Sequence, residues 1–105
     1  MARLAEFFGT DEEAIQELLQ VFAESLPVIV ARAKVSLNER NATLNAAAHE
    51  IKGASANIGA STLAHLAAEL EKATVTGHWP EADGLFSAIE IETQRIKTFI
   101  QHWKH

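Results

Sequence analysis

The sequence predicts an all-α domain. Apolar residues recur every three or four positions through most of the chain, which is the spacing of one helix face. No useful stretch alternates in the way that a half-buried strand does, and only two prolines, Pro27 and Pro80, interrupt the chain. Of the 105 residues 48% are hydrophobic, enough for a real core. Because no linker-like run divides the chain, we expect a single domain over residues 1–105.

The N-terminal third predicts a short helix followed by a long one. The short helix ends at Gly9 and is indicated by three apolar residues, Leu4, Phe7 and Phe8. Residues 10–13 then have the form of a capping box, with Thr10 at the cap and Glu13 three residues later. The apolar face of the long helix comprises Ile15, Leu18, Leu19, Phe22, Leu26, Ile29, Ala33 and Leu37. Pro27 lies within it, so we expect a kink or a break there.

The third helix, over residues 42–57, has two distinct rows of side chains. Asn41 can cap its start, and Gly59 is a suitable stop after its end. The row predicted to face the core is Leu44, Ala48, Ile51, Ser55 and Ile58. The neighbouring row, rotated toward the edge or solvent, is Asn45, His49, Lys52, Gly53 and Ala56.

Two further helices complete the prediction. Ser61 can cap the fourth helix, which ends between Thr74 and Gly77, and Pro80 suits the first turn of the last. The expected buried stripe of the last helix is Leu85, Phe86, Ile89, Ile96, Phe99, Ile100 and Trp103. Short connections between these amphipathic helices predict an antiparallel four-helix bundle with a short additional N-terminal helix. His49 would then lie near mid-helix, on the outer surface of a helical hairpin.

Composition excludes several classes of function. The chain has no cysteine, which rules out disulfides and thiolate zinc sites. A net charge of −5, with nine basic residues spread along the chain, argues against a nucleic-acid partner. No apolar run approaches the roughly 20 residues that cross a bilayer, and no signal-peptide pattern opens the chain. We therefore expect a cytoplasmic domain without membrane insertion.

His49 is the candidate reactive residue. A neutral imidazole is a nucleophile, and attack on a phosphoryl group needs an exposed ring nitrogen, clearance and nearby positive charge. Small neighbours leave clearance, and the Lys52 ammonium can reach oxygens carried on the ring. Gly53 costs the helix roughly 1 kcal/mol relative to alanine, so it serves partner clearance, close helix packing or both. The sequence shows no general base, metal cage or nucleotide-binding loop. We therefore expect a partner to supply the other groups that the reaction needs.

The segment His49-Glu50-Ile51-Lys52-Gly53-Ala54-Ser55, followed by Ile58-Gly59-Ala60, resembles the motif of histidine-containing phosphotransfer (HPt) domains of bacterial phosphorelays. The resemblance implies that His49 accepts a phosphoryl group from one receiver-domain aspartate and passes it to another. It implies that Lys52 stabilises the phosphohistidine and that Gly53 gives the partner room. The magnesium ion would belong to the receiver, so no cofactor or metal is expected in this chain. The expected docking rim is Asn45, Ala46, Ala56 and Asn57.

Two other functions stay open at this stage. The phosphoacceptor and dimerisation domain of a sensor kinase has a similar histidine box, but it typically continues with a small polar residue and proline where this chain has Gly53-Ala54. A helical interaction module with an incidental histidine is the other alternative, in which Lys52 is an ordinary solvated lysine. The expected partners are response-regulator receiver domains, including that of a hybrid sensor kinase, and we expect a monomer. The cytoplasmic domain could also be the cytoplasmic portion of a membrane-bound hybrid kinase. The remaining histidines, which complete no metal site, are His65, His78, His102 and His105.

Overall fold

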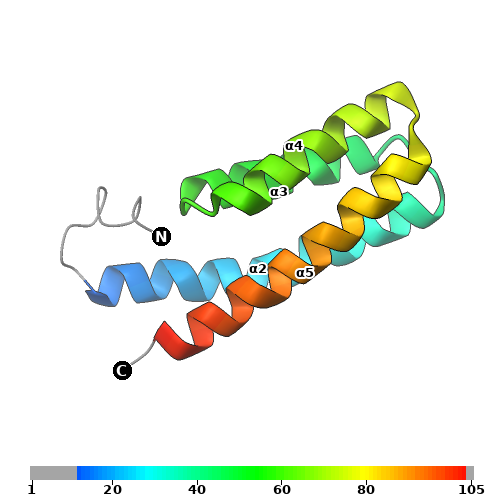
Figure 1. The fold of residues 1–105 in the computed structure, drawn as a ribbon. Coiled ribbons are helices and arrows are strands. Elements are labelled where there is room, and N and C mark those ends of the chain that lie inside the picture. The colour runs from blue at the N-terminus through cyan, green and yellow to red at the C-terminus, as the bar shows by residue number, and fades with distance from the viewer. Residues whose placement is uncertain (1–11, 104–105) are drawn as a thin grey trace.

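The computed structural model describes residues 12–103, which form four α-helices joined by short connections (Figure 1). The helices are α2 (Glu12–Asn38), α3 (Leu44–Asn57), α4 (Ser61–Thr76) and α5 (Trp79–Trp103). The described part of the chain contains no strand, which confirms the predicted all-α class. The predicted N-terminal helix over residues 4–9 and the cap at Thr10 lie outside the described residues.

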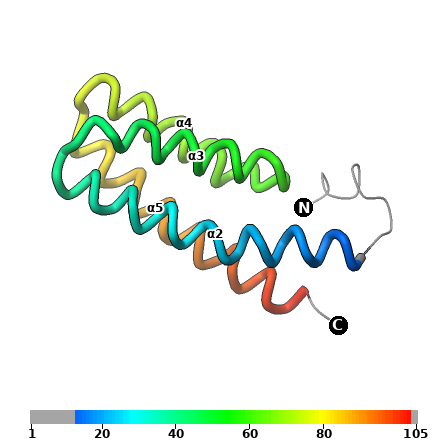
Figure 2. Tube along the Cα trace, turned by 180° about the vertical axis from the view of Figure 1, so that it is seen from behind, coloured from blue at the N-terminus to red at the C-terminus, as the bar shows by residue number. Residues whose placement is uncertain are grey.

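The four helices form an antiparallel bundle in which each helix packs against two others. The contacting pairs are α2 with α3, α3 with α4, α4 with α5, and α5 with α2. Figures 1 and 2 show that α3 and α4 form a hairpin lying along part of the longer pair, α2 and α5. Both α2 and α5 extend past this hairpin at one end, because they have 27 and 25 residues against 14 and 16.

The core is built from the apolar stripe of each helix, as the helical periodicity predicts. On α2 and α5 it includes Leu19, Leu26, Phe86 and Ile89, each at most 6% exposed. The inner row of α3 is fully confirmed, because every member is at most 2% exposed: Leu44, Ala48, Ile51, Ser55 and Ile58. This row fixes the rotation of α3 about its own axis and so determines which of its residues face outward.

Both helices of the hairpin end at a glycine in the left-handed conformation. Gly59 has φ of 78° and Gly77 has φ of 72°, values that glycine adopts without a Cβ clash. After α3, the amides of Gly59 and Ala60 donate to the carbonyls of Ala56 and Ser55, the two bonds of a Schellman motif. The predicted stop at Gly59 is therefore confirmed.

Two predicted caps differ from expectation. Ser61 is the first residue of α4 rather than its cap, which is Ala60, and its hydroxyl lies 3.5 Å from the Gly59 carbonyl oxygen. Asn41 acts one step earlier than expected: its side-chain oxygen accepts a bond of 2.9 Å from the Thr43 amide, and α3 begins at Leu44. Thr43 and Ala42 accordingly form the turn that leads into the helix.

The long helix α2 departs from the sequence prediction in two ways. One continuous helix runs from Glu12 to Asn38 with Pro27 inside it, so the predicted break does not occur, whereas the alternative of a kink at Pro27 stays a prediction. The segment Glu13–Asn38 is also long and apolar enough, by length and composition alone, to cross a membrane, contrary to the expectation that no run approaches that length. In the structure its Leu19 and Leu26 face the bundle core, although only 28% of the apolar window is buried.

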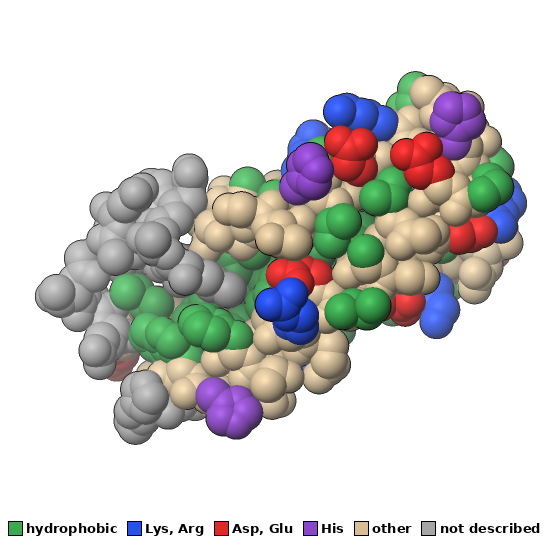
Figure 3. Space-filling model, in the orientation of Figure 1, with side chains coloured by type: hydrophobic (Ala, Val, Ile, Leu, Met, Phe, Trp, Pro, Cys, Tyr) green, Lys and Arg blue, Asp and Glu red, His purple; other side chains and the backbone are tan. Residues whose placement is uncertain are grey.

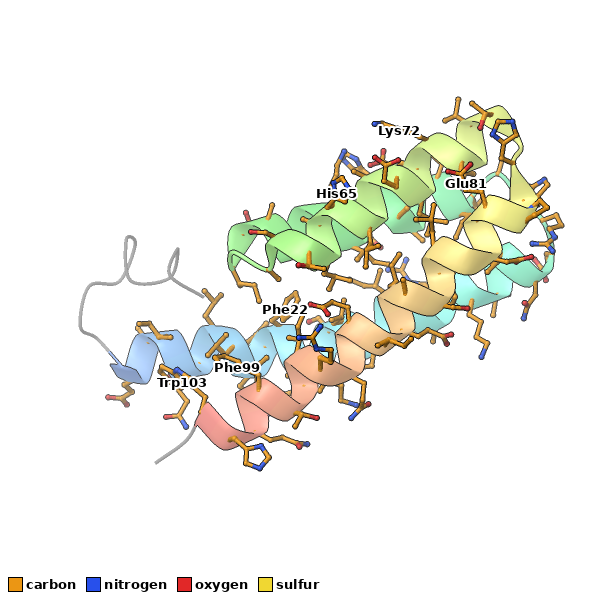
Figure 4. The ribbon with its side chains drawn as sticks, in the orientation of Figure 1. Phe22, His65, Lys72, Glu81, Phe99 and Trp103 are labelled. Carbon is orange, nitrogen blue, oxygen red and sulfur yellow. The ribbon has the colours of Figure 1, made fainter. Side chains whose placement is uncertain are left out.

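The predicted buried stripe of α5 is wrong at Phe99, which is 45% exposed. Figure 4 labels Phe99 and Trp103 on the last turns of α5, at the end of the bundle where α2 begins. The hairpin does not extend over this end of the bundle. Within the described residues, α5 therefore has α2 on one side there and no helix on the other. Trp103 and Leu85 are half-buried, whereas Phe86, Ile89, Ile96 and Ile100 are buried as expected.

Candidate functional site

His49 lies near the middle of α3 with its side chain 69% exposed. The neighbouring Ala48 is completely buried, so the backbone that carries His49 is held against the core while the ring points outward. Lys52 is half-buried on the same face, and Gly53 is exposed. The structure thus brings together the three residues that the sequence singled out, on the outer surface of the hairpin.

A carboxylate that sequence reasoning missed joins His49 to Lys52. Glu71 of α4 places Oε2 3.4 Å from Nδ1 of His49 and Oε1 2.7 Å from Nζ of Lys52. The Asn45 side-chain amide lies 3.4 Å from the backbone oxygen of Glu71, to which it donates a hydrogen bond. The signal for Glu71 is indirect: the register of an antiparallel hairpin places a residue in the second half of α4 opposite the middle of α3. The site therefore consists of residues from both helices of the hairpin.

The electrostatics of Glu71 follow from these contacts. The Lys52 ammonium lowers the pKa of the Glu71 carboxyl, partial burial opposes this effect, and His49 adds a smaller lowering contribution. Only 20% of the Glu71 side chain is exposed, so its charge is partly withdrawn from water. The Lys52 ammonium is consequently held on Glu71 in the isolated chain, rather than free over the imidazole.

Glu71→Gln is expected to lower the free energy of unfolding by about 1 kcal/mol or less near pH 7, because it removes this ion pair. A carboxyl whose pKa is lower in the folded chain stabilises that state above its unfolded pKa, and loses this contribution as pH falls through the folded pKa. The difference between the two proteins should therefore vanish in acid, below the ordinary carboxyl range. Urea unfolding at several pH values measures it, and a difference that persists at acid pH would contradict this account.

Gly53 is open to solvent. A Cβ built at this position would have no atom within 4 Å, apart from its chain neighbours and its own helix backbone. The alternative that glycine permits close helix packing is therefore wrong for the described residues. Clearance for a partner stays a prediction, with which the open space at Gly53 is compatible.

The predicted docking rim surrounds His49. Ala46, Ala56 and Asn57 are exposed, whereas Asn45 is half-buried by its contact with α4. Glu50, the residue after His49, does not contact it in the role of a base and instead pairs with Arg32 of α2. Figure 3 shows acidic, basic and histidine side chains gathered over the hairpin.

Within the described residues, no group of three or more histidine, cysteine or acidic side chains could hold a metal ion. His78 lies 3.7 Å from Glu81, with which it pairs when protonated, and Nδ1 of His102 lies 2.8 Å from the Thr98 carbonyl oxygen. His65 is an exposed residue of α4 (Figure 4). His105 lies outside the described residues. The arrangement at His49 is an exposed imidazole with a carboxylate beside Nδ1 and the Lys52 ammonium on the same carboxylate.

Comparison with known proteins identifies the family. A family model described as "Hpt domain" matches residues 17–100, which spans most of the chain and includes the whole hairpin. No curated protein and no solved structure was found to match. Hpt domains carry phosphoryl groups rather than catalyse a reaction of their own, and they interact with the receiver domains of response regulators. The chain therefore belongs to the Hpt family, whose function is histidine phosphotransfer in phosphorelays.

Proposed function

We propose that His49 is the phosphoacceptor of this Hpt domain. It takes a phosphoryl group from the aspartyl phosphate of one receiver domain and returns it to the aspartate of another, reversibly. The observation that carries this proposal is the exposed His49 ring, with Nδ1 3.4 Å from the Glu71 carboxylate and open space over Gly53. A monomer suffices, because each chain holds one such histidine.

Glu71 prepares the ring for attack. Its carboxylate favours the tautomer with the proton on Nδ1, which leaves the lone pair of Nε2 free. Nε2 attacks phosphorus, so that an N–P bond forms while the P–O bond to the aspartate breaks. The electron pair of that bond leaves with the aspartate carboxylate, and Nδ1 keeps its proton beside Glu71. Proton removal by a separate base is not needed, and the reverse transfer follows the same path.

Lys52 supplies positive charge for the product. A phosphoryl group on Nε2 introduces about two negative charges, and we place the Lys52 ammonium between its oxygens and Glu71. Lys52 is 38% exposed and its side chain is long, so it can turn from one anion to the other. The receiver supplies the magnesium ion and the remaining catalytic groups.

Transfer from phosphorylated receivers tests the proposal. Radiolabelled receiver domains from the same genome would each be incubated with the chain. The expected result is label on the chain that is lost in acid and retained in base, as a phosphoramidate is. Acid-stable label, or no label from any receiver, would refute the proposal and favour the helical interaction module.

ATP distinguishes the sensor-kinase alternative. The chain alone, or mixed with an isolated kinase ATP-binding domain, would be incubated with labelled ATP. We expect no label from ATP alone, since a phosphocarrier depends on its partner for catalysis. Labelling in this assay would favour the phosphoacceptor and dimerisation domain of a sensor kinase.

A further inference from the structure

A groove of about 530 Å³ lies between α2 and α3, and its lining includes Ala46 and Glu50, which flank His49 on α3. Val35 of α2 and Ala46 and Ala47 of α3 give it an apolar lining. Arg32 and Glu50 also line it, and they form an ion pair that joins the two helices. The groove is continuous with the candidate site, because Ala46 belongs to the docking rim and Glu50 follows His49 in the sequence.

The ion pair contributes little to the fold. The side chains of Arg32 and Glu50 are 59% and 50% exposed, and exposed pairs typically contribute about 0–1 kcal/mol. Neither charge contacts Glu71 or Lys52, whose own ion pair lies between α3 and α4. Its place in the groove therefore calls for an explanation other than stability.

The angular positions of residues around the α3 axis indicate on which side of His49 a partner's contact surface extends. At about 100° per residue, Ala46, Gly53 and Glu50 lie about 40–100° from His49 on the side of α2. Lys52 lies about 60° away on the opposite side, where it meets α4. The side toward α2 has the small residues and the groove, whereas the side toward α4 is closed by the Glu71 contacts.

A partner that reaches His49 must cover the ion pair as well. A specific protein interface covers roughly 800 Å² on each side, far more than one imidazole. Covering two charges removes water from them, which is favourable only when the partner offers complementary charges in the matching order. A partner with the opposite order is repelled, and such repulsion is a source of specificity.

We infer that Arg32 and Glu50 select the receiver domains with which this chain exchanges phosphoryl groups. The inference rests on the proposed function, because the occupant of the groove is the receiver that delivers or removes the phosphoryl group at His49. Arg32 faces an acidic group of that receiver and Glu50 faces a basic one, while an apolar receiver side chain enters the groove beside Val35.

The charge-swapped variant Arg32→Glu with Glu50→Arg tests this inference. The swap keeps the net charge of the chain and leaves an ion pair between the two positions. It reverses the positions of the positive and the negative charge that a partner meets. Transfer from a receiver that labels the wild-type chain should fall at least about tenfold. Potassium phosphoramidate, a small phosphodonor that needs no docking, should label both proteins at the same rate.

A second swap serves as the matched control. Lys34 and Glu90 form another exposed pair between helices, 3.6 Å apart, that joins α2 to α5 away from the groove. Exchanging Lys34→Glu with Glu90→Lys should leave receiver transfer unchanged, with both variants matching the wild type in helicity and melting.

Three outcomes would overturn the inference. These are unchanged transfer in the Arg32 and Glu50 swap for every receiver, an equal loss in the Lys34 and Glu90 swap, or an equal loss with phosphoramidate. Failure of the wild-type chain to take label from any receiver is a separate result, and it would refute the proposed function itself.

Discussion

His49→Gln is expected to abolish phosphoryl uptake from receiver domains, a loss of at least about a thousandfold. Glutamine has a similar length but no nucleophilic ring nitrogen, so the N–P bond cannot form. The fold should be unaffected, because the His49 side chain is 69% exposed and its neighbours Ala48 and Ile51 hold α3 in place. Its free energy of unfolding should stay within about 0.5 kcal/mol of wild type. Transfer assays with labelled receivers and urea unfolding measure the two quantities.

His65→Gln is the matched control for that substitution. His65 is an exposed histidine on α4, and it has no lysine or glycine in the positions that Lys52 and Gly53 hold relative to His49. Its variant should take label at the wild-type rate. Label that persists in His49→Gln, or that disappears in His65→Gln, would show that the phosphoacceptor lies elsewhere in the chain.

The sequence was sufficient to predict the helices and the outward row of α3, because both depend on periodicity. Leu44, Ala48 and Ile51 recur at helical spacing, and their burial leaves His49 outside. Gly59 could be recognised as a helix stop because a left-handed residue after a helix is usually glycine. These features are local, so a single sequence contains them.

What the sequence did not reveal depends on how the helices pack. Glu71 is 22 positions from His49, and only the register of the hairpin brings its carboxylate between His49 and Lys52. Phe99 fits the apolar periodicity of α5, yet it is exposed because the hairpin does not extend over that end of the bundle. Arg32 and Glu50 also lie on different helices, and only the packing of α2 against α3 brings them together. No spacing rule in the sequence connects them.

The structure also changes how Lys52 is understood. From the sequence it could be a free cation over the ring or an ordinary solvated lysine. In the structure it is paired, with Nζ 2.7 Å from Glu71. The two roles of Lys52 are compatible if they belong to different states of the chain. The same ammonium can neutralise Glu71 before transfer and a phosphoryl group on His49 after it. Glu71 would then hold Lys52 in place before transfer and release it afterwards.

Gly53→Leu is expected to slow transfer from receivers by at least about tenfold while making the chain more stable. A Cβ at this position meets nothing within 4 Å, apart from its chain neighbours and its own helix backbone, and leucine has the better helix propensity, by roughly 0.5–1 kcal/mol over glycine. The added side chain instead occupies the space beside His49 that the receiver must enter. Gly53→Ala should give a similar gain in stability with a smaller loss of rate.

Gly84→Leu provides the comparison that separates clearance from helix stability. Gly84 is also an exposed helical glycine with nothing within 4 Å of a built Cβ, but it lies on α5, away from the hairpin surface of His49. Its variant should gain stability to the same extent and transfer phosphoryl groups at the wild-type rate. A large loss of stability in Gly53→Leu, with transfer still at the wild-type rate, would contradict the clearance role. Equal slowing in both variants would mean that helix stiffness, rather than room for the partner, limits the reaction.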